Sequence, residues 1–190
     1  MKKNLASILA AALLAAAGGA SAQTYTLDPN HTYPSVEFKH LGVSTFRGKF
    51  NKTSGKVVLY RAAKTGTVDV SIDPASIDFG HDTMNSHARG ENWFKVDQHP
   101  TITFKGNVSR FDGDQPAQVD GQLTMLGVTK PVTLQLSGFR CIQHPMLKRE
   151  MCGGDATTTI SRREFGLNPS AGSVSDDVKL ALQIEGLREQ

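Results

Sequence analysis

The chain has 190 residues, of which 38% are hydrophobic, and its 21 Lys and Arg residues nearly balance its 18 Asp and Glu residues. This composition is typical of a globular protein and excludes a disordered or collagen-like chain. A formal net charge of +3 predicts no basic surface of the kind that binds nucleic acid.

Residues 1–22 have the three parts of a secretory signal peptide. Lys2 and Lys3 precede an apolar run from Leu5 to Ala17, and Ala20-Ser-Ala22 has the small-residue pattern of a cleavage site. The run is shorter than the ~18 residues that a membrane span needs. We therefore expect Sec-type export to the periplasm, cleavage after Ala22, and one mature domain over residues 23–190.

Cys141 and Cys152 are the only two cysteines of the chain. In an oxidising compartment such a pair usually forms a disulfide. The spacing differs from Cys-x-x-Cys, which favours a structural bridge over a redox pair. A bridge over so short a loop stabilises the fold by roughly 3 kcal/mol or less.

Alternating apolar and polar residues dominate the mature chain. This pattern is typical of antiparallel strands with one buried face, and Gly and Asp residues separate the runs as in hairpins. About eight strands can close into a barrel that has no free edges. The sequence therefore predicts an all-β, eight-stranded antiparallel β-barrel. The runs are residues 35–40, 56–60, 67–73, 101–105, 118–125, 132–136, 157–160 and 178–185.

Residues 81–96 lack this alternation. Asp82 can cap a short helix through Asn85, Ser86 and His87, and Gly90 can end it. A surface loop with a buried Trp93 is an equally good interpretation at this point. A helix here would close one end of the barrel.

The inward faces of the eight runs are almost wholly apolar, and periodicity alone does not decide between a packed core and an apolar cavity. A cavity would accept an elongated apolar molecule. The inward residues are Val36, Phe38, Val57, Leu59, Val68, Val70, Ile72, Ile102, Phe104, Leu123, Met125, Val132, Leu134, Leu136, Leu180, Leu182 and Ile184.

The sequence shows no catalytic or metal-binding motif. His81 and His87 lack a third ligand at strand or helix spacing, and the other four histidines are scattered. Nucleophile-elbow, phosphate-loop and dinucleotide-binding patterns are not found. We expect no catalytic residue, no metal and no cofactor of its own. A buried ionisable side chain in the barrel would instead favour an enzyme.

Several segments, in order and spacing, resemble the YceI family of periplasmic polyisoprenoid-binding proteins. They are Leu27–His31 with 36–43, Gly48–Phe50, His87–Arg89 with Trp93-Phe94, Pro100–Phe104, 121–124 with 127–132, and Ile160–Arg162 with Phe165-Gly166. The resemblance covers residues 25–185. The chain departs from it at Thr32 (usually Ser), Ala88 (often Leu) and Trp93 (Phe in the family's Phe-Phe pair), and the last two leave the preferred ligand open.

The resemblance implies a lipocalin-like barrel with a short helix near one opening, and an apolar tunnel for an isoprenoid chain such as a polyprenyl lipid or a quinone tail. We expect Arg47, Asn85, His87 and Arg89 at a polar rim, although solvated surface positions are the alternative. The expected tunnel residues are Phe38, Phe46, Phe50, Val70, Phe79, Met84, Trp93, Phe94, Phe104, Met125 and Leu134.

The leading hypothesis is a periplasmic carrier or sequestering protein for an isoprenoid-type lipid. One alternative is an envelope-stress or membrane-redox accessory protein that acts through its outer surface, and another is an enzyme on an apolar substrate in the barrel. Transient membrane contact and a homodimer stay open. An exposed apolar patch at the barrel mouth would favour docking to a membrane or a partner.

Overall fold

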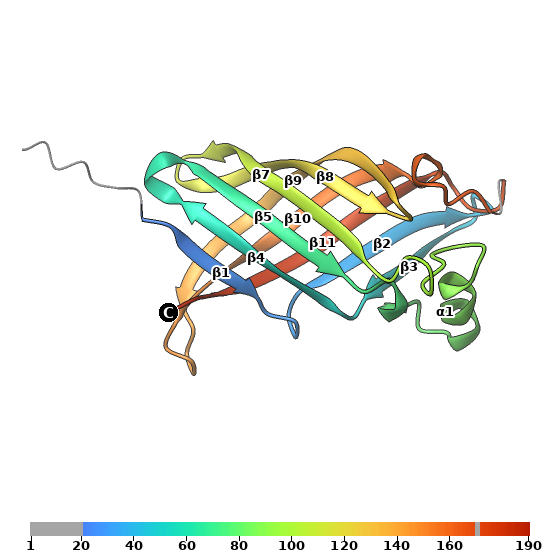
Figure 1. Ribbon diagram of the computed structural model, residues 1–190, viewed down its shortest axis with the longest axis horizontal. Coiled ribbons are helices and arrows are strands. Elements are labelled where there is room, and N and C mark those ends of the chain that lie inside the picture. Colours follow the sequence, from blue (N-terminus) through green and yellow to red (C-terminus); the bar gives the residue numbers. More distant parts are fainter. Residues whose placement is uncertain (1–20, 170–171) are drawn as a thin grey trace, which may run out of the picture.

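The computed structural model describes residues 21–169 and 172–190, so the predicted signal peptide lies almost entirely outside the described residues. Strands dominate the described chain (Figure 1). The elements are β1 (Gln23–Leu27), β2 (Tyr33–His40), β3 (Ser44–Phe50), β4 (Thr53–Tyr60), the 3₁₀ turn η1 (Arg61–Ala63), β5 (Thr65–Ile72), η2 (Pro74–Ser76), β6 (Ile77–Asp78), α1 (Asp82–Arg89), β7 (Ile102–Asp112), β8 (Gln115–Met125), β9 (Val128–Gln143), β10 (Glu150–Ser161), η3 (Arg163–Phe165) and β11 (Asp177–Arg188).

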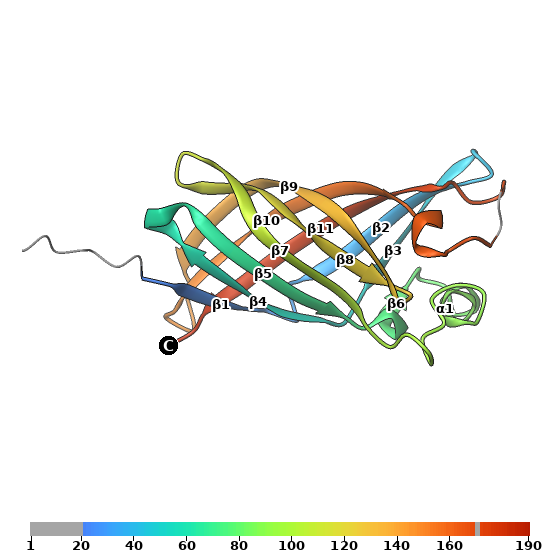
Figure 2. The same cartoon turned by 45° about the horizontal axis from the view of Figure 1, so that its top comes forward.

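The strands form a closed antiparallel barrel. Neighbours follow the order β1-β4-β5-β7-β8-β9-β10-β11, and β11 pairs back with β1 to complete the ring. The two views in Figures 1 and 2 show the strands wrapping around one elongated interior. Closure pairs the strand edges that an open sheet would expose. The prediction of an eight-stranded antiparallel barrel is confirmed.

The ring has eight strand positions. Three of them are each occupied by two short strands that follow one another along the barrel. One edge of β11 pairs with β1 through residues 186–188 and with β2 through residues 179–183. In the same way, β3 and β4 together occupy the next strand position of the ring, and β5 and β6 together occupy the one after it. Each of the eight runs expected from the sequence falls on a different barrel position. The short strands β1, β3 and β6 were not predicted.

The barrel has two unlike ends. The helix end carries α1 and the β2–β3 turn at residues 41–43, and the disulfide end carries Cys141, Cys152 and the C-terminus (Figure 1). The predicted helix is confirmed as α1. However, the N-cap is His81, without a side-chain cap bond, and Asp82 is already in the first turn. Gly90 ends the helix, as expected, and its N–H donates to the carbonyl of His87 at 3.1 Å.

Candidate ligand-binding site

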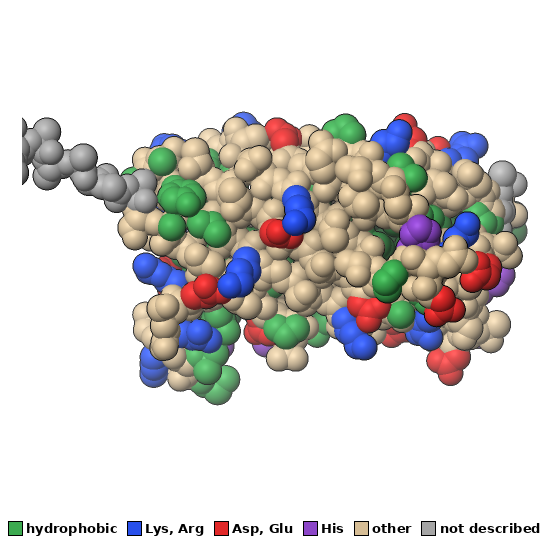
Figure 3. Space-filling view, viewed as in Figure 1, with side chains coloured by type: hydrophobic (Ala, Val, Ile, Leu, Met, Phe, Trp, Pro, Cys, Tyr) green, Lys and Arg blue, Asp and Glu red, His purple; other side chains and the backbone are tan. Residues whose placement is uncertain are grey.

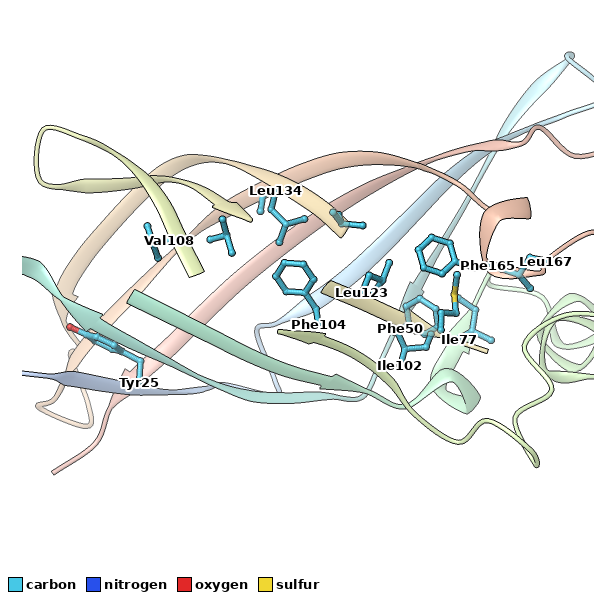
Figure 4. Packing of buried hydrophobic residues seen from close by; sticks show 14 of the residues in the cluster. Tyr25, Phe50, Ile77, Ile102, Phe104, Val108, Leu123, Leu134, Phe165 and Leu167 are labelled. Atoms are coloured by element: carbon cyan, nitrogen blue, oxygen red, sulfur yellow. The ribbon is translucent and has the colours of Figure 1, made fainter. Parts of the chain in front are cut away.

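A cavity of about 560 Å³ lies inside the barrel. This volume is within the range of known small-molecule sites, roughly 300–1,000 Å³. All of the inward-facing residues expected from the alternation line it. The interior that the sequence left open, packed core or cavity, is therefore hollow. Figure 4 shows buried side chains projecting inward from Tyr25 at the disulfide end, past Phe104, to Phe165 and Leu167 at the helix end.

The structure brings all of the expected tunnel residues to the wall of this cavity, although they come from six strands and from the segment that joins β6 to β7. Their role as ligand contacts stays a prediction. They are Phe38, Phe46, Phe50, Val70, Phe79, Met84, Trp93, Phe94, Phe104, Met125 and Leu134.

Of the four expected rim residues, only His87 lines the cavity. Arg47 follows Phe46 on β3, and successive side chains of a strand point to opposite faces. Because Phe46 points inward, Arg47 lies on the outer surface with 66% of its side chain exposed, and its Nε is 3.5 Å from Oε1 of Glu37. The expected place of Arg47 at the rim is therefore wrong.

Asn85 and Arg89 attach the helix to β6 instead of surrounding the cavity. Asn85 is buried: its Oδ1 accepts from the N–H of Phe79 at 2.7 Å, and its Nδ2 donates to Oδ1 of Asp78 at 3.0 Å. Arg89 donates to the carbonyl of Ile77 at 3.3 Å. Positions four apart share one face of a helix, so these two residues form one face.

The opposite face of α1 belongs to the cavity. Thr83, Met84, His87 and Ala88 line the cavity from this helix. The sequence predicted the helix but could not assign its faces, because rotation of the helix about its axis exchanges the polar residues that point inward with those that point to β6.

Aromatic side chains surround the cavity at the helix end. Phe38 makes edge contacts with Phe46 and Phe79 at centroid distances of 5.8 and 5.9 Å, and His40 stacks on Phe46 at 4.8 Å. All four are only half-buried, and Thr83 beside them is exposed. These exposures place the mouth of the cavity between the β2–β3 hairpin and α1.

The disulfide end is closed by buried groups. Tyr25 and Leu59 are each 2% exposed there, and both line the cavity. Outside Tyr25, Nη2 of Arg61 donates to the Tyr25 hydroxyl at 3.0 Å and to Oε1 of Glu150 at 2.6 Å. Burial raises the pKa of Tyr25 above its ordinary value. This polar network covers the buried Tyr25 ring at the disulfide end.

The predicted disulfide between Cys141 and Cys152 is confirmed. The two residues are direct partners in the register of β9 and β10, so the bridge joins neighbouring strands. Cys152 is 6% exposed and faces the cavity, while Nη2 of Arg61 lies 2.9 Å from Sγ of Cys141. The bridge therefore reinforces the closed end.

Sequence reasoning missed Arg162, a buried cation beside the cavity. It is 2% exposed, and its Nε and Nη2 donate to the carbonyls of Ser175 and Val174 at 2.9 and 3.0 Å. Its Nη1 donates to the carbonyl of Leu167, and its guanidinium lies 5.6 Å from the ring centre of Trp93. Burial lowers the pKa of Arg162 below its ordinary value. The Arg162 side chain holds the β10–β11 connection against the barrel.

Two clusters of side chains within the described residues have the composition of a metal site. In one of them, Cys141 and Cys152 are bridged and offer no thiolate. In the other, Nδ1 of His31 is 2.7 Å from Oδ2 of Asp28, a hydrogen-bonded pair on the outer surface, with Glu185 at 3.9 Å. This pair holds the β1–β2 turn together. That the protein binds no metal stays a prediction.

A search of the described helices for a long, apolar membrane-spanning segment found none.

The fold and the cavity define a closed β-barrel built around an apolar chamber. Comparison with known proteins gives its family: the model of the YceI-like domain matches residues 25–186. The chain belongs to the YceI-like family, as the sequence segments indicated. It is 33% identical to a UPF0312 protein of Pectobacterium atrosepticum and 32% identical to one of Pseudomonas aeruginosa, in each case over the whole length of both chains.

Solved structures share the barrel. BcnA of Burkholderia cenocepacia superposes with a TM-score of 0.70 at 23% identity, over 84% of this chain and 98% of that one. A polyisoprenoid-binding domain of Saccharophagus degradans, implicated in plant cell wall breakdown, gives 0.62 at 16% identity, over 87% and 98%. At these identities the likeness shows the fold.

Proposed function

We propose that the mature protein is a periplasmic carrier or sequestering protein that holds one isoprenoid-type lipid, a polyprenyl lipid or a quinone tail, inside the barrel. The observation that carries this proposal is the cavity of about 560 Å³ with its almost wholly apolar wall. A binding protein for an elongated apolar molecule needs such a chamber and little else.

Apolar contact supplies the affinity in this proposal. Removing apolar surface from water yields about 25 cal/mol per Å², so a long hydrocarbon chain in a dry chamber binds with few polar contacts. Phe104, Leu123 and Leu134 line the middle of the cavity, and all three side chains are buried from solvent. Because no charge holds the tail, salt should change the affinity little.

The difference between the two ends orients the ligand. The polar side chains Thr83 and His87 line the cavity at the mouth, whereas Tyr25 and Leu59 close the far end. The isoprenoid tail therefore runs toward the disulfide end, and the head group rests near α1. A neighbouring fold whose protein is described as polyisoprenoid-binding supports this ligand class.

Export to the periplasm is part of the proposal. The signal-like residues 1–22 motivate it, and the Cys141–Cys152 bridge is consistent with an oxidising compartment.

Arg162 is the buried ionisable side chain that would favour an enzyme. However, main-chain carbonyls of Leu167, Val174 and Ser175 accept from its guanidinium, and an arginine does not release its proton in a protein. A permanently charged group that donates to three main-chain carbonyls is no general acid or base. Its bonding supports a structural role, and we propose no catalytic residue.

Mass spectrometry of organic extracts from protein purified without detergent tests the proposal. Leu134 and Gln135 are neighbours on β9, with Leu134 inside the barrel and Gln135 outside. Leu134→Lys places a charge in the apolar chamber, at high cost, and Gln135→Lys is its matched control.

We expect near-stoichiometric isoprenoid-type lipid from the parent and from Gln135→Lys, and none from Leu134→Lys. Far-UV circular dichroism must first show that both variants fold; if Leu134→Lys does not fold, Val70→Asp replaces it. Lipid-free extracts from the parent, or the same lipid from a folded charged-cavity variant, would contradict the proposal.

A further inference from the structure

The turn between β2 and β3 exposes two apolar side chains beside the cavity mouth. Leu41 is 60% exposed and Val43 is 86% exposed. Single exposed apolar residues are common on protein surfaces and need no explanation. These two, however, form the tip of the hairpin that also builds the mouth.

The backbone holds this tip outward. Leu41 and Gly42 both have left-handed conformations, with φ of 52° and 69°. Such a conformation is uncommon for leucine. The N–H of Leu41 donates to the carbonyl of Ser173 at 2.7 Å, and the N–H of Val43 donates to that of His40 at 3.0 Å. The apolar side chains therefore project from an ordered turn.

The inner side of the same hairpin is part of the cavity wall. Phe38, His40 and Phe46 line the cavity immediately before and after the turn. One residue pair, His40 and Ser44, separates the Phe38–Phe46 pair from the turn. The apolar tip therefore lies close to the aromatic wall of the cavity.

The outer side of the hairpin is basic. Lys39, Arg47 and Lys49 are exposed there, against one acidic residue, Glu37, which is already paired with Arg47. Nζ of Lys39 donates to Oγ1 of Thr45 at 2.8 Å. Each Lys or Arg near an anionic bilayer adds to the attraction of the protein to its surface. An apolar tip with basic flanks fits a bilayer that carries anionic head groups.

We propose that the Leu41–Val43 tip inserts into the surface of an anionic lipid bilayer, so that the cavity mouth faces the membrane and an isoprenoid lipid passes between bilayer and barrel. This inference rests on the proposed function, since it names where that ligand enters and leaves.

The β9–β10 turn is the competing surface. Met146 is 81% exposed and Leu147 is 50% exposed, next to Lys148 and Arg149. In Figure 3 this hairpin protrudes at the lower left with hydrophobic and basic side chains on it. It lies at the closed disulfide end, so docking there would turn the mouth away from the membrane. The position of the mouth therefore favours the Leu41–Val43 tip over the β9–β10 turn as the surface that docks to the membrane.

Vesicle flotation of the mature chain tests the proposal, with vesicles of phosphatidylethanolamine and phosphatidylglycerol compared with pure phosphatidylcholine. The test variant is Leu41→Asn with Val43→Thr, since asparagine accepts the left-handed backbone and threonine keeps the branched shape. The matched control is Met146→Asn with Leu147→Thr. We expect binding to anionic vesicles that falls about tenfold or more in the Leu41/Val43 variant, and less than about twofold in the control.

A second measurement separates docking from ligand binding. Trp93, the single tryptophan of the chain, lines the cavity, so its fluorescence reports binding of geranylgeraniol from detergent solution. The Leu41/Val43 variant should bind this probe like the parent from detergent but extract it from vesicles at a rate about tenfold lower. If the parent floats with vesicles but binds no geranylgeraniol or longer isoprenoid, the proposed function fails and the docking tip stands.

Three results would overturn the docking proposal. They are a parent that does not bind anionic vesicles, a loss of binding in the Met146/Leu147 variant alone, and a dimer in solution that the Leu41/Val43 changes dissociate. The first would leave a protein partner as the occupant of the tip, and the third would leave a second copy of the chain.

Discussion

The two ends of the barrel close by different means. At the disulfide end the pairing of β8 with β9 stops at Gln118 and Gln135, and a disulfide and the Arg61–Tyr25–Glu150 network cover the interior. At the helix end the pairing of β9 with β10 stops at Gln135 and Thr157, and β6 pairs with β3 but not with β7.

Inserted segments fill the places where strands do not pair at the helix end. Residues 79–101, which include α1, lie between β6 and β7, and the described residues 162–169 and 172–176 lie between β10 and β11 (Figure 2). Because these segments are held by a few side-chain bonds and not by a strand ladder, this end can leave a mouth. The two ends therefore differ in what covers the interior, because strand pairing is interrupted at both.

The largest effect on stability should come from Arg162→Met at the helix end. This change leaves the carbonyls of Leu167, Val174 and Ser175 without their buried donor. Buried unsatisfied groups cost about 1–3 kcal/mol each, so we expect a loss of about 3 kcal/mol or more in the free energy of unfolding, measured by urea titration. The neighbouring Arg163→Met, an exposed partner of Asp176, should cost less than about 1 kcal/mol. Equal losses for the two changes would show that Arg162 does not hold the helix end.

Reduction of Cys141–Cys152 should lower the free energy of unfolding by about 3 kcal/mol or less, because the bridged loop is short. Binding of geranylgeraniol should persist, since the bridge reinforces the end away from the mouth. Trp93 fluorescence with and without reductant measures both properties. Binding abolished by reduction in still-folded protein would show that the disulfide end takes part in ligand access.

A smaller effect is expected from Arg61→Met at the disulfide end. The change removes the donor to Tyr25 and Glu150, but Nη1 of Arg188 still lies 3.2 Å from Oε2 of Glu150. We expect a loss of about 1 kcal/mol in the free energy of unfolding, because the pair is partly solvated. A loss as large as that of Arg162→Met would remove the contrast between the ends.

Acid should weaken the helix end in a defined pH window. Hydrogen bonds from Arg163 and Ser161 lower the pKa of Asp176 from its ordinary value of 3.8 to about 2. Because the folded-state pKa is the lower one, the stabilisation by Asp176 is present above the unfolded value and is lost as the pH falls toward 2. Asp176→Asn should flatten the stability profile in this window, measured by thermal unfolding. An unchanged profile would contradict this assignment.

The sequence predicts the barrel well because alternation is a local signal. Each of the eight runs marks one barrel position, and the inward residues of these runs all line the cavity. The short strands β1, β3 and β6 were not predicted, because each shares a strand position of the barrel with a longer alternating run. Whether the interior is filled or hollow depends on the diameter of the closed barrel, which no local pattern contains.

The polar residues of the site were harder to predict because their places depend on contacts far along the chain. Asn85 and Arg89 were expected at the rim, and the structure uses them to hold the helix to β6. Arg162 was not among the expected site residues. Its burial depends on carbonyls that the β10–β11 connection brings back to it, which sequence spacing does not show.

The most direct test of the account is the affinity for isoprenoid alcohols of increasing length, read from Trp93 fluorescence at low and high salt. If the tail lies in the apolar chamber, each added isoprene unit should strengthen binding about tenfold or more until the chamber is filled, because each buried CH₂ contributes about 0.8 kcal/mol. Salt should change these affinities little. Affinity that is independent of chain length, or binding that high salt abolishes, would contradict the account and place the ligand outside the barrel.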